Sequence, residues 1–148
     1  MEHQLITYSA EETMNLGQKF VALAKPGSTF CLTGDLGAGK TTLVRGIARA
    51  LNIKSVVQSP TFNIMKLYLK GNRPLIHIDA YRLADINTDI GLDEYIGYET
   101  GITMIEWPLF IKDLLPENTL WIEITSTGET SRHIDVYSSD SNLVGGLK

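Results

Sequence analysis

The sequence contains one cysteine, Cys31, among its 148 residues. A single thiol cannot form an intramolecular disulfide, so a disulfide-stabilised secreted scaffold is excluded. A reducing, cytoplasmic location is the expectation that follows. Because Cys31 lies in the apolar run Thr29–Leu32, it is interpreted as a small core side chain rather than a reactive thiol.

Long apolar runs and linker-like segments are also missing. No run approaches the roughly 18 residues that a membrane-spanning helix requires. The first eight residues, MEHQLITY, include an acidic side chain and no long apolar core, so they do not resemble a signal peptide. There is no internal repeat and no Pro/Ser-rich linker. We therefore expect one domain over residues 1–148, with a frayed tail after about residue 138.

The formal net charge of −4 conceals an uneven distribution. Residues 40–82 contain eight Lys and Arg against Asp79 alone, a local balance of +7. Residues 83–129 contain ten Asp and Glu against Lys112 alone, a local balance of −9. A basic segment suits a polyanion and an acidic one suits a basic protein. Ordinary solvated faces would give the same pattern, so both interpretations stay open.

Apolar periodicity and turn residues predict alternating helices and strands. Ser9–Glu12 has the pattern of a capping box before a helix that ends at Lys25-Pro26-Gly27. Taken together, the expected helices and strands predict a three-layer α/β domain whose mixed central sheet is flanked by helices. The expected strands cover 28–33, 62–69, 75–79, 102–105, 120–126 and 133–137, and the other expected helices cover 40–51, 85–90, 92–96 and 109–115.

The stretch Gly34-x-x-x-x-Gly39-Lys40-Thr41 matches the P-loop pattern G-x-x-x-x-G-K-[ST]. Glycines let successive backbone N–H groups turn toward phosphate oxygens. Lys40 supplies a positive charge near the β- and γ-phosphates, Thr41 offers a hydroxyl to Mg²⁺, and the following helix directs its N-terminus at the anion. The motif follows an expected strand and opens an expected helix, so it predicts a P-loop NTPase-like fold and a nucleotide site rather than a glycine-rich helix start.

Two carboxylates end expected strands and are candidates for the acidic groups that a P-loop requires. Asp79 follows Leu75–Ile78, and Glu106 follows Ile102–Ile105. The carboxyl ends of strands line the ligand crevice in open α/β sheets. Neither strand has the usual apolar run ending in Asp-Glu, so this would be an atypical Walker B. Either carboxylate could orient the attacking water or hold Mg²⁺.

Two further elements are less specific. In Gln58–Phe62, the proline stiffens a turn that would present the Thr61 hydroxyl as a γ-phosphate sensor, although an ordinary turn has the same sequence. His77 lies in the middle of a strand and is interpreted as a core or edge residue in preference to a catalytic one.

Four motifs in order resemble those of the TsaE family, formerly YjeE. They are Gly34–Thr42 (GDLGAGKTT), Ser59–Phe62 (SPTF), His77–Leu83 (HIDAYRL) and Ile105–Pro108 (IEWP). The resemblance spans about residues 5 to 137. It implies a P-loop ATPase that acts with the TsaB–TsaD heterodimer in the N6-threonylcarbamoyladenosine modification of tRNA.

The resemblance also implies roles for individual residues. ATP phosphates would be held by the loop residues Asp35, Leu36, Gly37, Ala38, Gly39, Lys40, Thr41 and Thr42. Thr41 and Glu106 would hold Mg²⁺, with Lys40, Asp79 and Glu106 as the catalytic set. Thr61 fits the sensing position, and Thr13 and Arg132 would approach the adenine.

Two other functions are alternatives to a P-loop ATPase that acts in tRNA modification. A small-molecule kinase also uses a P-loop, but no arginine-rich lid that would exclude water is evident. A nucleotide-dependent binding module would have only incidental hydrolysis. The sequence lacks an Asn-Lys-x-Asp stretch, which favours ATP over GTP. Contact between the basic segment and tRNA is a further expectation.

Overall fold

The computed structural model describes most of the chain, and its elements form a seven-stranded sheet with two helices. The described residues are 2–25, 27–34, 38–54, 65–80, 96, 100–107, 115–116 and 118–138. In chain order the elements are β1 (Glu2–Thr7), α1 (Ala10–Leu23), β2 (Ser28–Thr33), α2 (Lys40–Ala50), β3 (Met65–Tyr68), β4 (Leu75–Asp79), β5 (Ile102–Glu106), β6 (Leu120–Ser126) and β7 (Arg132–Tyr137).

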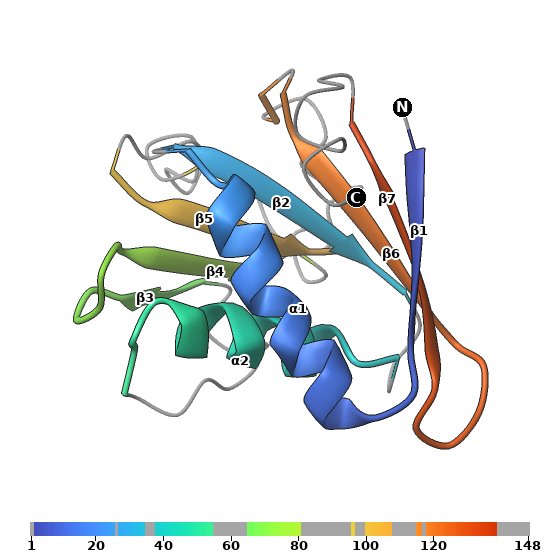
Figure 1. The fold of residues 1–148 in the computed structure, drawn as a ribbon. Helices are drawn as coiled ribbons and strands as arrows, with labels where there is room; N and C mark the ends of the chain where they lie inside the picture. The colour runs from blue at the N-terminus through green and yellow to red at the C-terminus, as the bar shows by residue number, and fades with distance from the viewer. Residues whose placement is uncertain are drawn as a thin grey trace.

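The sheet is mixed, with parallel strands at its centre and antiparallel strands at both edges. The spatial order is β1-β7-β6-β2-β5-β4-β3 (Figure 1). Strand β2 pairs in parallel with β5 and β6, and β4 pairs in parallel with β5. The carboxyl ends of these four strands therefore meet at one edge of the sheet, which is where the sequence placed the candidate site.

The structure confirms the predicted α/β class and mixed sheet. The strands predicted at 28–33, 75–79 and 120–126 have these bounds in the structure, and the hairpins β3–β4 and β6–β7 are antiparallel as expected. At the start of α1, Ser9 accepts a hydrogen bond from the Glu12 N–H at 3.0 Å. The reciprocal bond of the capping box is displaced by one residue, because Glu12 accepts from the N–H of Tyr8.

Strand β1 was not predicted. It pairs antiparallel with β7 near the other end of the chain, with Leu5 opposite Ile134. Leu5 packs against the core, whereas Ile6 is 58% exposed. Six residues with so little apolar alternation are a weak strand signal, and the partner lies more than a hundred residues away. The long-range pairing with β7, and not a local sequence pattern, makes residues 2–7 a strand.

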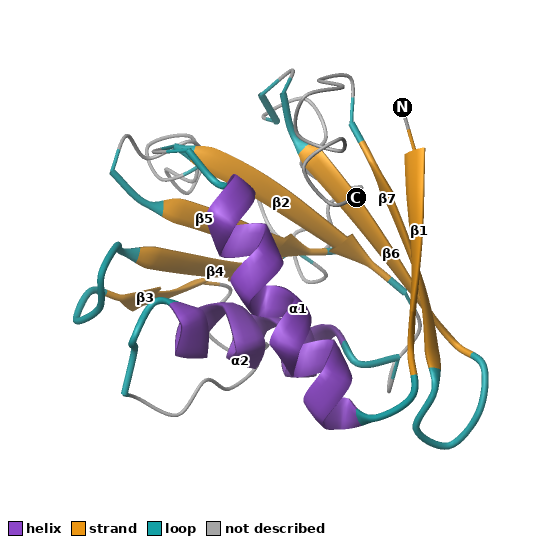
Figure 2. Ribbon diagram, in the orientation of Figure 1, coloured by secondary structure: helices purple, strands orange, loops and turns teal. Residues whose placement is uncertain are grey.

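Both helices cover the same face of the sheet (Figures 1 and 2). Their apolar sides pack with inward residues of the strands into one cluster, which we call the helix-side core. Phe20 of α1 and Leu43 of α2 are fully buried in it, as are Leu32 and Met104 of the sheet. Neither described helix is long and apolar enough to cross a membrane.

The opposite face carries a second, smaller apolar cluster, which we call the far-side core. It contains Cys31, Ile78 and Ile105, and Ile96 and Leu115 contribute from connecting segments. Three helices were expected at 85–90, 92–96 and 109–115, and of their residues only Ile96 and Leu115 lie within the described part of the chain. The frayed tail expected after about residue 138 lies outside the described residues.

The two helices cross at a pair of glycines, and this crossing gives the first prediction. A Cβ at Gly46 would overlap the backbone carbonyl of Met14, and one at Gly17 would overlap the backbone of Gly46. Gly46→Ala gains about 1 kcal/mol of helix propensity, but separating two packed helices costs about 1–3 kcal/mol. We expect a lower free energy of unfolding, measured in urea. The control is Gln18→Ala at an exposed position of α1, which should be close to neutral. A Gly46→Ala chain at least as stable as the wild type would contradict this packing.

Cys31 gives the second prediction. Burial raises the pKa of its thiol to about 12, so at pH 8 only about one thiol in ten thousand is ionised and nucleophilic. The folded chain should not react with a disulfide reagent at pH 8, and one thiol per chain should react in denaturant. Gln18→Cys, at an exposed helix position, should react without unfolding. Prompt labelling of Cys31 in the native chain would show that the far-side core opens.

Candidate phosphate-binding site

The segment between β2 and α2 turns sharply at its described ends. Gly39 is the residue before α2 and has a left-handed φ of 105°, a conformation in which glycine carries no Cβ penalty. Gly34 follows β2, and a Cβ there would overlap the Ile124 carbonyl of β6. Asp35, Leu36 and Gly37 lie outside the described residues. Both described ends therefore require glycine, as expected where a loop leads into the N-terminus of a helix.

Lys40 is the first residue of α2, and its ammonium group lies back across the loop. Nζ donates to the Gly34 carbonyl at 2.7 Å and lies 3.9 Å from the centre of the Trp107 ring. The side chain is buried, with 6% of the residue exposed. Trp107 has a left-handed φ of 56°, a strained conformation for a non-glycine residue that costs about 1–2 kcal/mol. Trp107 belongs to the Ile105–Pro108 motif, and the structure places its ring against the predicted phosphate-binding lysine.

Asp79 and Glu106 lie side by side at the carboxyl edge of the sheet. They are register partners on β4 and β5, and Leu32 of β2 is the next residue in the same row. Side chains alternate along a strand, and Leu75 and Met104 belong to the helix-side core. Both carboxylates therefore point to the face on which α2 begins. They are almost fully buried, at 6% and 4% exposed.

His77 contacts the predicted metal ligand Glu106 directly, a contact that was not predicted from the sequence. Its Nε2 lies 2.7 Å from Oε2 of Glu106, and the histidine is completely buried. Nδ1 has no hydrogen-bond partner among the described residues. The signal available in the sequence was the spacing His77-x-Asp79, which puts both side chains on the same face of β4.

The two residues that the resemblance assigned to the adenine side share a small cavity of about 80 Å³. Thr13 enters it from α1 and Arg132 from β7, beside Gly39 and Thr42 of the loop and the first turn of α2. The Thr13 hydroxyl is bonded to that of Thr7 at 2.7 Å. Thr41 and Thr42 are half-buried, and Thr61 lies outside the described residues.

Arg132 joins this cavity to the loop. Its Nε donates to the Ala38 carbonyl at 2.8 Å, and its Nη1 donates to the carbonyls of Ser131 and Gly128 at 2.7 and 3.2 Å. One guanidinium therefore holds both the loop and the turn between β6 and β7. The turn is also tied to the start of α1, because the Thr130 hydroxyl donates to the Tyr8 carbonyl at 2.8 Å.

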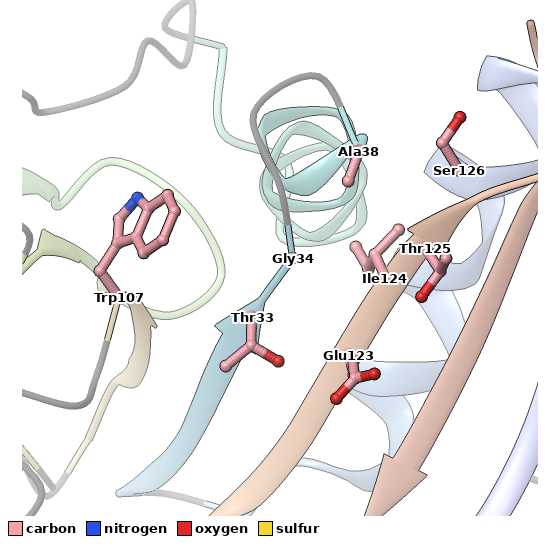
Figure 3. A pocket seen from close by; sticks show the side chains of 8 residues that line it. All are labelled: Thr33, Gly34, Ala38, Trp107, Glu123, Ile124, Thr125 and Ser126. Atoms are coloured by element: carbon pink, nitrogen blue, oxygen red, sulfur yellow. The ribbon is translucent and has the colours of Figure 1, made fainter.

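A larger cavity of about 370 Å³ also adjoins the described ends of the loop (Figure 3). Gly34, Ala38 and Trp107 border it, together with Thr33, Glu123, Ile124, Thr125 and Ser126. In Figure 3, Trp107 lies across from β6, with the end of β2 between them. Nothing in the residue pattern had indicated the contribution of β6.

The bridging role of Arg132 gives the third prediction. A lysine keeps the charge but cannot bond the loop and the turn in the same fixed geometry. Losing a charge-assisted hydrogen bond costs about 1.5–3 kcal/mol, so Arg132→Lys should weaken ADP binding about 10- to 100-fold, measured by calorimetry. Arg49→Lys is the matched control, because Arg49 pairs with Glu11 at an exposed helix position. Equal ADP affinities in all three chains would mean that Arg132 does not shape the loop.

Known proteins share both this sequence and this fold. The profile of the family described as "Threonylcarbamoyl adenosine biosynthesis protein TsaE" matches residues 7–134. A protein of Bacillus subtilis named "tRNA threonylcarbamoyladenosine biosynthesis protein TsaE" is 44% identical over 128 residues, covering 86% of this chain and 80% of that protein. A Treponema pallidum protein of the same name is 38% identical over 133 residues, with 88% and 97% covered.

A solved structure has the same architecture. The crystal structure of Bacillus subtilis YdiB matches 99% of this chain and 92% of its own, with a TM-score of 0.84 and 35% identity. The agreement therefore extends from the motifs to the arrangement of the whole sheet. This chain belongs to the TsaE family.

Proposed function

We propose that this chain binds ATP with Mg²⁺ at the loop between β2 and α2 and hydrolyses it. The observation that carries the proposal is one arrangement at the carboxyl edge of the sheet. A buried lysine at the start of α2 crosses its own loop. Two buried carboxylates, Asp79 and Glu106, lie on the same side of the sheet as that helix. This combination of a cation, a helix N-terminus and acidic side chains is what phosphoryl transfer requires.

The side chains present fit Mg²⁺ chemically. Magnesium prefers oxygen ligands, usually one or two carboxylates together with substrate phosphates. Glu106 offers a buried carboxylate and Thr41 a hydroxyl in the first turn of α2. These two would hold the ion, which would neutralise charge on the β- and γ-phosphates. Asp79, on the next strand, would hold an attacking water.

Charge supports placing the nucleotide in one of the two cavities beside the loop. Volume alone favours the larger cavity, but the only charged side chain in its described lining is the carboxylate of Glu123, which would repel phosphate. The smaller cavity is also lined by a carboxylate, that of Glu129, but it contains the guanidinium of Arg132 as well, beside Thr13 and Thr42. We therefore place the phosphates on Lys40 and the N-terminus of α2, and the base toward Thr13 and Arg132.

The names of the relatives support a role for this reaction. Those compared above are named for tRNA threonylcarbamoyladenosine biosynthesis. We propose that this chain serves the same modification together with TsaB and TsaD, and that its partners use the change between its ATP-bound and ADP-bound states. Contact between tRNA and the basic residues of segment 40–82 belongs to the same proposal. The slope of log affinity against log salt measures such phosphate contacts, and a flat line would exclude them.

The proposal is tested by measuring phosphate release from ATP and Mg²⁺. The chain is assayed alone and then with purified TsaB–TsaD and tRNA, and Lys40→Ala measures any contaminating activity. We expect slow release that the partners stimulate and that Lys40→Ala lacks. Tight ATP binding without release under either condition would instead identify a binding module. Transfer of phosphate to a small acceptor, with little free phosphate, would identify a kinase.

The role of Glu106 gives the fourth prediction. Glu106→Gln keeps the shape of the side chain but removes the charge that holds Mg²⁺. We expect hydrolysis to fall by about a hundredfold or more, while ADP affinity without Mg²⁺ stays within about threefold of the wild type. Phosphate release and calorimetry measure the two quantities. Hydrolysis at the wild-type rate would move the metal-binding role to another residue, and loss of folding, followed by circular dichroism, would make Glu106 structural.

A further inference from the structure

We propose that His77 is a positioning residue that fixes the Glu106 carboxylate for Mg²⁺. This inference rests on the proposed function, because it assigns a task within the same metal site. The Nε2 of His77 lies 2.7 Å from Oε2 of Glu106, and both side chains are buried. No residue of the P-loop pattern is involved, and the partners are 29 positions apart in the chain.

A Glu106 carboxylate that holds Mg²⁺ requires His77 to be the donor of this hydrogen bond. An ionised carboxylate only accepts hydrogen bonds, so Nε2 carries the proton and donates it to Oε2. In this tautomer Nδ1 has no proton, and no buried N–H is left without an acceptor. Oε1 of Glu106 then remains as the oxygen for the cation. His77 thereby fixes the orientation of a ligand that would otherwise rotate about three side-chain bonds.

Stability alone does not account for a histidine at this position. Its neighbours on the same face of the sheet, Leu75 of β4 and the register partner Met104 of β5, are buried and apolar. A third apolar side chain would avoid burying a polar ring with one nitrogen lacking a partner among the described residues. Buried polar pairs of this kind contribute little net stability compared with apolar residues. The pair is better explained by the orientation it imposes on Glu106.

Groups that hold metal ligands in place change metal affinity when they are removed. Such substitutions typically cost 10- to 100-fold in affinity. His77→Leu removes the donor, and His77→Asn is a polar alternative whose short amide matches Nδ1 and does not reach Glu106. His77→Gln is the conservative variant, because its amide nitrogen lies near the position of Nε2 and donates to the carboxylate.

The experiment measures ADP binding by calorimetry over a range of Mg²⁺ concentrations, so no turnover is involved. We expect His77→Leu and His77→Asn to raise the half-saturating Mg²⁺ concentration about 10- to 100-fold and to leave ADP affinity without Mg²⁺ nearly unchanged. His77→Gln should restore most of the magnesium dependence. In a Glu106→Gln background, His77→Leu should add no further loss, because His77 acts only through the carboxylate.

Thr29→Val is the matched control for removing a buried polar group from the same sheet. The Thr29 hydroxyl lies in β2 and also lacks a partner within the described part of the chain. The Thr29→Val chain should keep the magnesium dependence of the wild type. If His77→Leu does not fold, the magnesium dependence of ADP binding is compared between His77→Asn and His77→Gln.

Three results would overturn the assignment. Unchanged magnesium dependence in His77→Leu or His77→Asn overturns the role of His77 alone. A His77→Gln chain as impaired as these variants shows that packing, not the hydrogen bond, matters. A wild-type chain whose ADP affinity does not respond to Mg²⁺ overturns the metal site as well, and so identifies a failure of the proposed function.

Discussion

A buried ammonium group is the constraint on which the rest of this site depends. Lys40 is almost inaccessible to solvent, and burying a cation is costly unless other groups replace its hydration. The Gly34 carbonyl and the face of the Trp107 ring do so here. Both contacts require a particular backbone: the loop must bring Gly34 beneath the lysine, and Trp107 must adopt a left-handed conformation directly after β5. The ends of β2 and β5 must therefore be fixed relative to the start of α2, and their parallel pairing achieves this.

The loop is also anchored from the opposite end of the chain. Arg132 reaches from β7 to the Ala38 carbonyl across 94 positions in sequence and also bonds the carbonyls of its own turn. Because Thr130 bonds the chain just before α1, three segments meet around one side of the loop. Arg132 therefore links Ala38 of the loop to the turn between β6 and β7.

The elements that depend on residues close together in the chain could be predicted from the sequence. The strand and the side-chain contacts that depend on residues far apart in the chain could not. The central strands and the helix after the loop were predictable because apolar runs and turn residues mark them locally. The row containing Asp79 and Glu106 followed from the rule that parallel strands end at one edge. Strand β1 was missed because its partner is β7, and the bonds of His77 and Arg132 join residues 29 and 94 positions apart. Register and side-chain contact at such separations are set by packing and leave little local trace.

The local irregularities of the fold also gather at this site, which is an independent argument for its importance. Sequences specify structures by satisfying local preferences, and departures are expected where function requires them. Lys40 is a buried cation, Trp107 has a strained backbone, and His77 keeps a buried ring nitrogen without a partner among the described residues. All three contact Gly34, Glu106 or one another within a single edge of the sheet. An edge selected only for stability would replace these groups with apolar side chains and relaxed turns. Their occurrence together at one edge supports the proposal that this edge binds phosphate and a cation.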